Sequence, residues 1–338
     1  MKRTYAAMVV AGCLWAVVLP AVAAGPQEKV AAAEQGDPAL FTAYVERLKQ
    51  QALAQGISQR TVDIAFADVH FVGRVVSQDK NQPEKKLTLD DYLTRVLSAK
   101  KLERGRVLLE QHRAKLNALS MKYGVPPQYI VTLWGLESYY GRMPGKEDVI
   151  SALATLAFEG RREAFFTGQL MAALKILQDG HIGREQMKGS WAGAMGQNQF
   201  MPASFLKYGA DGDEDGRIDI WNNVNDVFAS TANYLASEGW RNGERWGQEV
   251  RLPAGFDERL AGLRDDQSAD AETWLRRGVT LADAQAVPPG QARAWIILPD
   301  DAQGRAFMVY DNFRVLMHWN RSYYFAISVG MMADGLAR

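Results

Sequence analysis

Apolar residues recur at helical spacing along most of the chain. From about residue 38 to residue 112, and again from 114 to about 239, they fall at i, i+3, i+4 and i+7, as helices with one buried face require. The polar stretch 78–86 predicts a loop inside this region. The apolar segment 322–336 keeps the helical spacing and predicts a last helix that packs back on the main body.

The segment 251–305 has a different character. It contains several prolines and an apolar run, Ala-Trp-Ile-Ile-Leu at 294–298, whose composition is typical of a strand. We therefore expect a mostly helical α+β protein. Its parts would be a main helical domain at 38–250, a small mixed α/β subdomain at 251–305, and a C-terminal segment at 306–338 that packs back on the main domain.

The first 24 residues have the composition of an export signal. Lys2 and Arg3 precede an uncharged apolar run, and Ala-Val-Ala at 21–23 has the form of a cleavage site. Residues 25–37 are polar and rich in alanine, which predicts a linker. We expect export to the periplasm, with removal of the signal.

Two other fates of this segment remain open. The uncharged stretch 5–24 is long enough to be a retained membrane anchor. Val-Ala-Gly-Cys at 10–13 resembles the lipobox of bacterial lipoproteins, and acylation there would attach the protein to the outer membrane through an N-terminal lipid. Cys13 is the only cysteine, so the folded part has no disulfide, cysteine nucleophile or cysteine metal site.

The charges of the chain are balanced, with 39 Lys and Arg against 39 Asp and Glu. Binding to a polyanion by counterion release needs a basic surplus, so we expect no nucleic-acid partner. The four histidines, at positions 70, 112, 181 and 318, lack the spacing of metal ligands.

One glutamate, Glu137, falls on an apolar stripe. Pro-Pro at 126–127 suits the first turn of a helix, and Gly141 is placed to end that helix. In this register Glu137 shares a face with Trp134. Burial disfavours a charged carboxylate, so we expect the pKa of Glu137 to rise, as a general acid requires. A glutamate turned to solvent, or paired with Arg142, is the alternative.

Four motifs follow one another along the chain: Glu-Ser-Tyr-Tyr-Gly-Arg at 137–142, Ser-Ala-Leu-Ala-Thr-Leu-Ala-Phe at 151–158, Gly-Arg-Arg at 160–162, and Gly-Ser-Trp-Ala-Gly-Ala-Met-Gly-Gln-Asn-Gln-Phe-Met-Pro at 189–202. With 211–221, 232–235 and 319–322, they strongly resemble the membrane-bound lytic murein transglycosylase B family, over most of the chain after about residue 40. The resemblance implies a lysozyme-like catalytic domain with a small β-containing subdomain and an EF-hand-like loop.

The resemblance also implies a reaction with one catalytic carboxyl group. Hydrolytic glycosidases usually use two carboxylates, and the sequence ties neither Glu159 nor Glu163 to a reacting face. Glu137 would protonate the oxygen between N-acetylmuramic acid and N-acetylglucosamine, and would then take the proton of the muramoyl C6 hydroxyl. That hydroxyl closes on C1 and leaves a 1,6-anhydromuramoyl end, without water and without a cofactor for catalysis.

Substrate contacts are implied in the same way. Ser190 and Gln199 match residues that orient the acetamido group and the sugar, Tyr234 and Asn320 match active-site residues, and Arg161 and Arg162 match a pair that contacts the glycan or its peptide stem. The residues of 189–202 suit such a role, since small side chains admit a sugar and the polar ones offer hydrogen bonds. A tight helix-packing turn is the alternative.

An acidic run at 211–219 follows the pattern of an EF-hand calcium loop. Acidic residues stand at positions 1, 3, 5 and 9 and glycine at position 6, but position 12 is Asn222 rather than Glu. The resemblance implies a longer loop closed by Asp226, with Asn225 as the adjacent alternative. We expect a structural Ca²⁺ rather than a solvated acidic turn, held by Asp211, Asp213, Asp215, Arg217 (position 7) and Asp226.

We therefore expect a monomeric lytic transglycosylase of the periplasm that acts on the glycan strands of peptidoglycan. Two other functions remain open. One is a muramidase that hydrolyses the same bond, and the other is a calcium-stabilised peptidoglycan-binding module without turnover.

Overall fold

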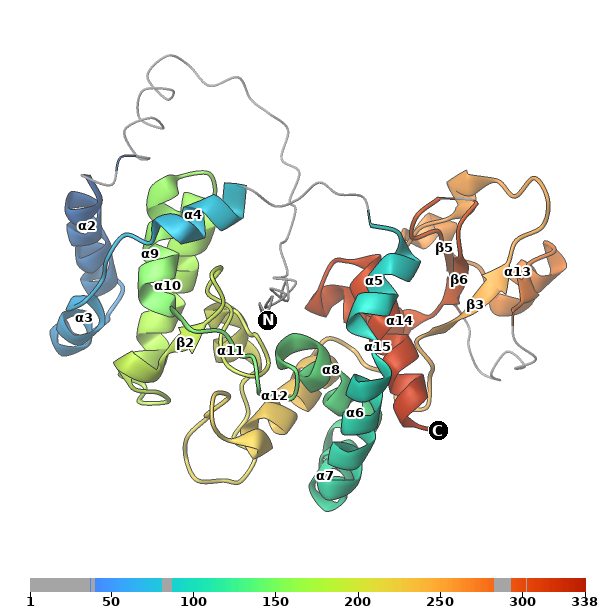
Figure 1. Cartoon of the computed structure of the whole chain (residues 1–338), viewed down its shortest axis with the longest axis horizontal. Helices are drawn as coiled ribbons and strands as arrows, with labels where there is room; N and C mark the ends of the chain where they lie inside the picture. Colours follow the sequence, from blue (N-terminus) through green and yellow to red (C-terminus); the bar gives the residue numbers. More distant parts are fainter. Residues whose placement is uncertain (1–36, 38–39, 81–86, 283–292, 302) are drawn as a thin grey trace, which may run out of the picture. The chain divides into compact units, whose positions relative to one another are not determined.

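A computed structural model gives the fold and describes residues 37, 40–80, 87–282, 293–301 and 303–338 (Figure 1). Within these residues it is mostly helical, with one two-stranded and one four-stranded antiparallel sheet. The predicted α+β class is therefore confirmed. The described residues form two compact units, each built from two stretches of sequence. The first combines residues 37–80 with Glu137–Val227, and the second combines residues 87–136 with Phe228–Arg338.

The predicted signal at 1–24 and the linker, apart from residue 37, lie outside the described residues. In the part of the chain that the structure describes, every helix is too short or too polar to cross a membrane. The domain boundaries proposed from the sequence stay a prediction.

The first unit is built around helix α9, Val149–Glu159. Its residues from Val149 to Phe158 are all buried, and a helix that is apolar all round must be covered on every side. Helices α2, α4 and α10 pack against it. The elements of this unit are α2 (Phe41–Ala54), α3 (Gln59–Phe66), α4 (Gly73–Lys80), the end of α8 (Pro127–Ser138), β1 (Glu147–Asp148), α10 (Glu163–Gln178), η2 (Arg184–Gln186), β2 (Lys188–Gly189), α11 (Pro202–Tyr208) and the start of α12 (Val224–Ser237).

The predicted loop at 78–86 is wrong in its first part. Residues 78–80 form the last turn of α4, where Asp79 is buried and pairs with Arg161 and Arg162. These ion pairs hold a polar turn in helical conformation, since tertiary contacts override local propensity. Residues 81–86 lie outside the described part.

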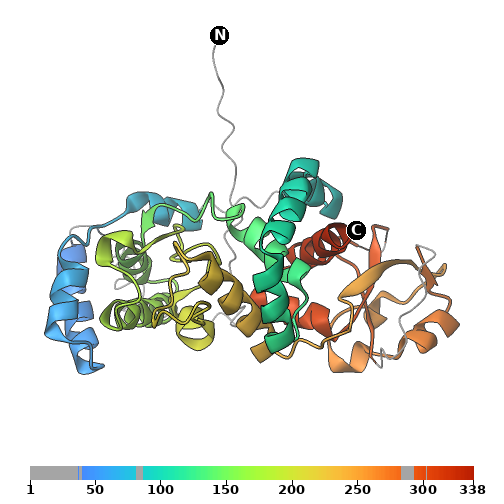
Figure 2. The same cartoon turned by 90° about the horizontal axis from the view of Figure 1, so that it is seen from below.

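The second unit combines helices with the larger sheet (Figure 2). The strand order of this sheet is β4-β3-β6-β5. Strand β5 confirms the strand predicted at 294–298, and α15 confirms the predicted last helix. The elements of this unit are α5 (Leu89–Val96), α6 (Ala99–Gln111), α7 (Arg113–Tyr123), most of α8 and α12, β3 (Gly247–Arg251), η3 (Glu258–Leu260), η4 (Asp265–Gln267), α13 (Ala271–Arg276), β4 (Thr280–Leu281), β5 (Trp295–Ile297), β6 (Ala306–Val309), α14 (Asp311–Trp319) and α15 (Tyr323–Leu336).

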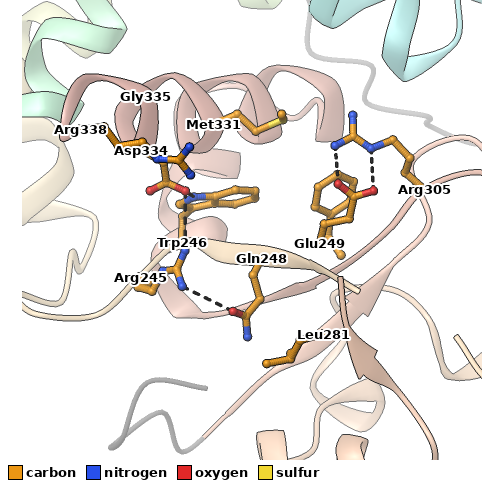
Figure 3. A pocket seen from close by; sticks show the side chains of 11 residues that line it. Arg245, Trp246, Gln248, Glu249, Leu281, Arg305, Met331, Asp334, Gly335 and Arg338 are labelled. Carbon is orange, nitrogen blue, oxygen red and sulfur yellow. Dashed lines mark hydrogen bonds and ion pairs between the residues drawn. The ribbon is translucent and has the colours of Figure 1, made fainter. Parts of the chain in front are cut away.

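Trp246, the residue before β3, packs against α15. Its indole lies against Gly330, where an added Cβ would be 2.1 Å from the ring. Its Nε1 donates to a carboxylate oxygen of Asp334 at 3.1 Å, and Figure 3 shows the two groups facing each other. Burial raises the pKa of Asp334, although Trp246 and Arg245 favour the charged form.

The close fit of Trp246 on α15 predicts the effect of a methyl group. We expect Gly330→Ala to lower the free energy of unfolding by about 1–3 kcal/mol, because the methyl overlaps the indole. Gly168→Ala in α10 is the matched control, since nothing lies within 4 Å of its added Cβ. The higher helix propensity of alanine at position 168 should raise the free energy of unfolding by up to about 1 kcal/mol. Urea denaturation measures both changes, and a Gly330→Ala protein as stable as its parent would contradict this packing.

Candidate active site

Glu137 is the penultimate residue of α8. The residue is only 6% exposed, as its helical register predicts. Trp134, one turn earlier, is also buried, and its ring meets those of Phe228 and His112 edge-on. Trp134 therefore packs in the core, while Glu137 lies at the point where the helix ends.

The turn after Glu137 has a strained backbone. The helix ends at Ser138 rather than at the predicted Gly141, because Tyr139 and Tyr140 adopt left-handed φ values of 51° and 59°. The Oγ of Ser138 accepts the N–H of Gly141 at 3.0 Å and so stabilises the turn. Strain of this kind concentrates at functional sites, which makes the turn a candidate.

A loop between β2 and α11 packs closely against this turn. A Cβ on Gly145 would lie 2.1 Å from the carbonyl oxygen of Gly189. A Cβ on Gly141 would lie 2.2 Å from Oε1 of Gln197. Both glycines also have positive φ, so only glycine suits these positions.

Ser190 and Gln199, both predicted to contact substrate, lie on this loop. Gln199 has a left-handed φ of 53°, and its Nε2 donates to the carbonyl oxygens of Pro144 and Gly196 at 2.8 Å each. The Oγ of Ser190 accepts the N–H of Ala194 at 3.1 Å. The first unit therefore holds the segment with Ser190 and Gln199 against the turn that follows Glu137.

Arg161 and Arg162 lie between α9 and α10 and bridge to α4. Arg162 pairs with Asp79 at 2.7 Å, and Arg161 pairs with Asp79 and, at 3.1 Å, with Glu159. The Arg161 side chain is 51% exposed, so it remains accessible to a ligand. Both arginines thus have structural ion pairs, and their contact with the glycan or its peptide stem stays a prediction.

Tyr234 contacts the end of α14, just before Asn320, in the second unit. The hydroxyl of Tyr234, on α12, donates to the carbonyl oxygen of His318 at 2.8 Å, and its ring meets that of Trp319 at 4.6 Å. Asn320 follows the end of α14 directly, in extended conformation. Sequence reasoning missed one supporting contact, the pairing of His318 Nδ1 with Glu238 at 2.9 Å. The only feature of the sequence that points to this pair is that Glu238 stands one helical turn after Tyr234.

The acidic loop of the first unit brings three carboxylates together. Oxygen atoms of Asp211, Asp213 and Asp226 lie within 4.8 Å of one another. Asp226 is fully buried and accepts the N–H groups of Gly212 at 2.7 Å and Asp219 at 2.6 Å. Burial raises the pKa of Asp226, the backbone hydrogen bonds oppose the rise, and the charges of Asp213 and Asp211 add to it.

The remaining predicted ligands are placed differently. Asp215 lies outside the three-carboxylate group and accepts the N–H of Arg217 at 2.8 Å. Asn225 directs its amide nitrogen to Asp213 at 3.3 Å, as a donor. Of the two candidates for the closing ligand, Asp226 therefore has the better geometry. A buried carboxylate beside two others needs a cation or a proton, and this set of hard oxygens fits Ca²⁺.

A cavity of about 220 Å³ lies between α15 and the sheet of the second unit (Figure 3). Arg245, Trp246 and Asp334 line one part of it, and the ion pair of Arg305 with Glu249 lines another. None of the predicted site residues lines this cavity.

Comparison with known sequences agrees with the predicted family. A family model described as Transglycosylase SLT domain matches residues 40–334. Membrane-bound lytic murein transglycosylase B of Escherichia coli is 39% identical over 171 residues, which cover 49% of this chain and 47% of that protein. The match thus spans about half the length of this curated relative.

Solved structures share the fold. SltB3 of Pseudomonas aeruginosa, in complex with NAG-NAM-pentapeptide, is 43% identical with a TM-score of 0.84, covering 88% of this chain and 79% of that one. The lytic transglycosylase Slt35 of Escherichia coli, in complex with calcium, is 27% identical with a TM-score of 0.75, covering 87% and 92%. These structures confirm the predicted lysozyme-like, mostly helical fold. Since the family model covers most of its length, this chain belongs to the transglycosylase SLT domain family.

Proposed function

We propose that the protein is a lytic transglycosylase that cleaves the β-1,4 bond between N-acetylmuramic acid and N-acetylglucosamine in peptidoglycan. The observation that carries the proposal is the burial of Glu137 at the end of α8, beside a strained turn and a glycine-lined loop. The similarity to SltB3, whose structure holds a NAG-NAM-pentapeptide, supports a glycan substrate.

Glu137 acts first as an acid and then as a base. Its carboxyl group gives a proton to the departing glycosidic oxygen while the bond to C1 of the muramoyl residue breaks. The resulting carboxylate takes the proton of the C6 hydroxyl, whose oxygen bonds to C1. Because the nucleophile belongs to the same sugar, it already lies close to C1 and no water enters. Ser190, Gln199, Tyr234 and Asn320 hold the glycan, and Arg161 and Arg162 contact it or its peptide stem.

The surroundings of the neighbouring glutamates favour this mechanism over hydrolysis. A second carboxylate is usual in hydrolytic glycosidases. Glu159 pairs with Arg161 and Lys80, and Glu163 accepts a hydrogen bond from Tyr44 at 2.8 Å. Both side chains therefore have structural partners, and Glu137 serves as the sole acid and base.

We also assign a structural Ca²⁺ to the acidic loop. Asp211, Asp213 and Asp226 would hold it, with Asp215 and the Arg217 backbone as further ligands after a small adjustment of the loop. The calcium in the Slt35 structure supports this assignment. The ion would neutralise the buried carboxylate and stabilise the fold.

We place the protein in the periplasm as a monomer, since its proposed substrate is cell-wall peptidoglycan. The relative from Escherichia coli is named as membrane-bound. Lipid attachment through Cys13 remains the alternative to a cleaved signal, and both concern residues outside the described part of the chain.

The reaction products give the first test of the mechanism. Digestion of purified murein should release muropeptides with 1,6-anhydromuramoyl ends, which are one water lighter than hydrolytic products. Mass spectrometry separates the two. Products that carry a reducing end would identify a muramidase instead.

Substitution of the acid gives a second test. We expect Glu137→Gln to lower turnover at least about 10³-fold, because an amide neither donates this proton nor accepts the second one. Glu163→Gln is the matched control and should keep turnover, since its amide oxygen still accepts from Tyr44. Circular dichroism checks both folds. Full activity of Glu137→Gln would refute the assignment, whereas retained murein binding without turnover in the parent would indicate a binding module.

Removal of the metal gives a third test. At a calcium concentration of about 100 times Kd, we expect the melting temperature to lie about 5–10 °C above that in chelator. Asp226→Asn should abolish this difference, and Asp266→Asn, on an exposed side chain outside the loop, should keep it. The melting temperatures are measured by calorimetry. If the parent melted at the same temperature in calcium and in chelator, this result would count against a bound ion.

A further inference from the structure

Helices α6 and α7 carry a local excess of positive charge. The segment Ala99–Tyr123 has seven Lys and Arg against two acidic residues, in a chain whose formal charge is zero. Lys101 is buried, and burial lowers its pKa, but the other six side chains are exposed or half-exposed. Such a concentration of charge in a neutral protein attracts an anionic partner.

Part of this charge converges on a concave surface of the second unit. A cavity of about 450 Å³ lies where α6, α7, the start of α8 and the end of α15 meet. This volume is in the range of ligand sites. We call it the arginine groove; the polar and charged side chains that line it are Arg106, Arg113, Arg338, Glu110, Asn117 and Gln128.

The contacts within the groove are weak enough for a ligand to replace them. Arg113 pairs with Glu110, and both side chains are about two-thirds exposed. Exposed pairs of this kind contribute little stability. An incoming carboxylate can therefore take the place of Glu110. Arg106 is anchored through one nitrogen to the carbonyl oxygen of Gly335 at 2.8 Å, which holds its guanidinium group in the groove.

We infer that the arginine groove is a second binding site for the substrate polymer and takes carboxylate groups of its peptide stems. Guanidinium groups match planar carboxylates with two parallel hydrogen bonds, and the amides of Asn117 and Gln128 suit the peptide groups beside them. A concave site fits separate anionic groups better than it fits a flat lipid surface. The inference rests on the proposed function, because it takes murein as the polymer.

Retention on insoluble murein sacculi tests the inference. All proteins carry Glu137→Gln, so that the polymer stays intact. At low salt, we expect Arg106→Gln with Arg113→Gln to lower retention roughly tenfold. Arg259→Gln with Arg276→Gln removes two charges from exposed arginines elsewhere in the second unit and should change nothing. Because Arg106 also bonds to Gly335, Arg113→Glu alone is a second variant, and melting temperatures report on the fold.

Three further measurements decide between the outcomes. Sacculi stripped of stem peptides by an amidase should retain the parent as poorly as the double variant. Unchanged retention of both groove variants on intact sacculi would overturn the inference, as would groove-dependent binding only to vesicles of anionic phospholipid. With Glu137 restored, the groove variants should turn over short soluble glycans at the parental rate. If the parent showed no turnover but its retention still depended on the groove, the proposed function would be refuted. The inference that the groove binds the polymer would still hold.

Discussion

The proposed chemistry depends on keeping one carboxyl group away from bulk water while its helix ends beside it. Burying an ionised carboxylate is costly, and Glu137 is buried. Trp134, one turn earlier on α8, is also buried, and its ring contacts those of Phe228 and His112. The helix ends at Ser138, directly after Glu137, and the chain turns there.

That sharp ending has a conformational cost. Two consecutive tyrosines, Tyr139 and Tyr140, adopt left-handed φ angles, and an unstrained helix would continue to Gly141 instead. The surrounding contacts offset the cost: Ser138 holds the N–H of Gly141, and Gly145 fits against the backbone of Gly189. The positions that admit no side chain are thus the same ones at which the loop between β2 and α11 packs against the turn after Glu137.

The parts that the sequence predicts well are those set by periodicity. Spacing places Glu137 on a buried face and predicts α15, while the composition of residues 294–298 predicts β5. The parts it misses are set by contacts between distant residues. Asp79 keeps residues 78–80 helical through Arg161 and Arg162, some 80 positions away, and no local pattern reports such a pair. The roles proposed for Ser190, Gln199, Tyr234 and Asn320 rest on family resemblance, since hydrogen-bonding residues do not by themselves specify a sugar.

The buried carboxyl groups of the first unit have different surroundings, and these surroundings bear on the role proposed for Glu137. Asp79 pairs with two arginines, Arg161 and Arg162. Asp226 lies beside Asp211 and Asp213, and the Ca²⁺ proposed for this loop would neutralise the buried carboxylate. Glu137 lies elsewhere, as the penultimate residue of α8, and its burial beside the strained turn at Tyr139 and Tyr140 supports its proposed role as acid and base.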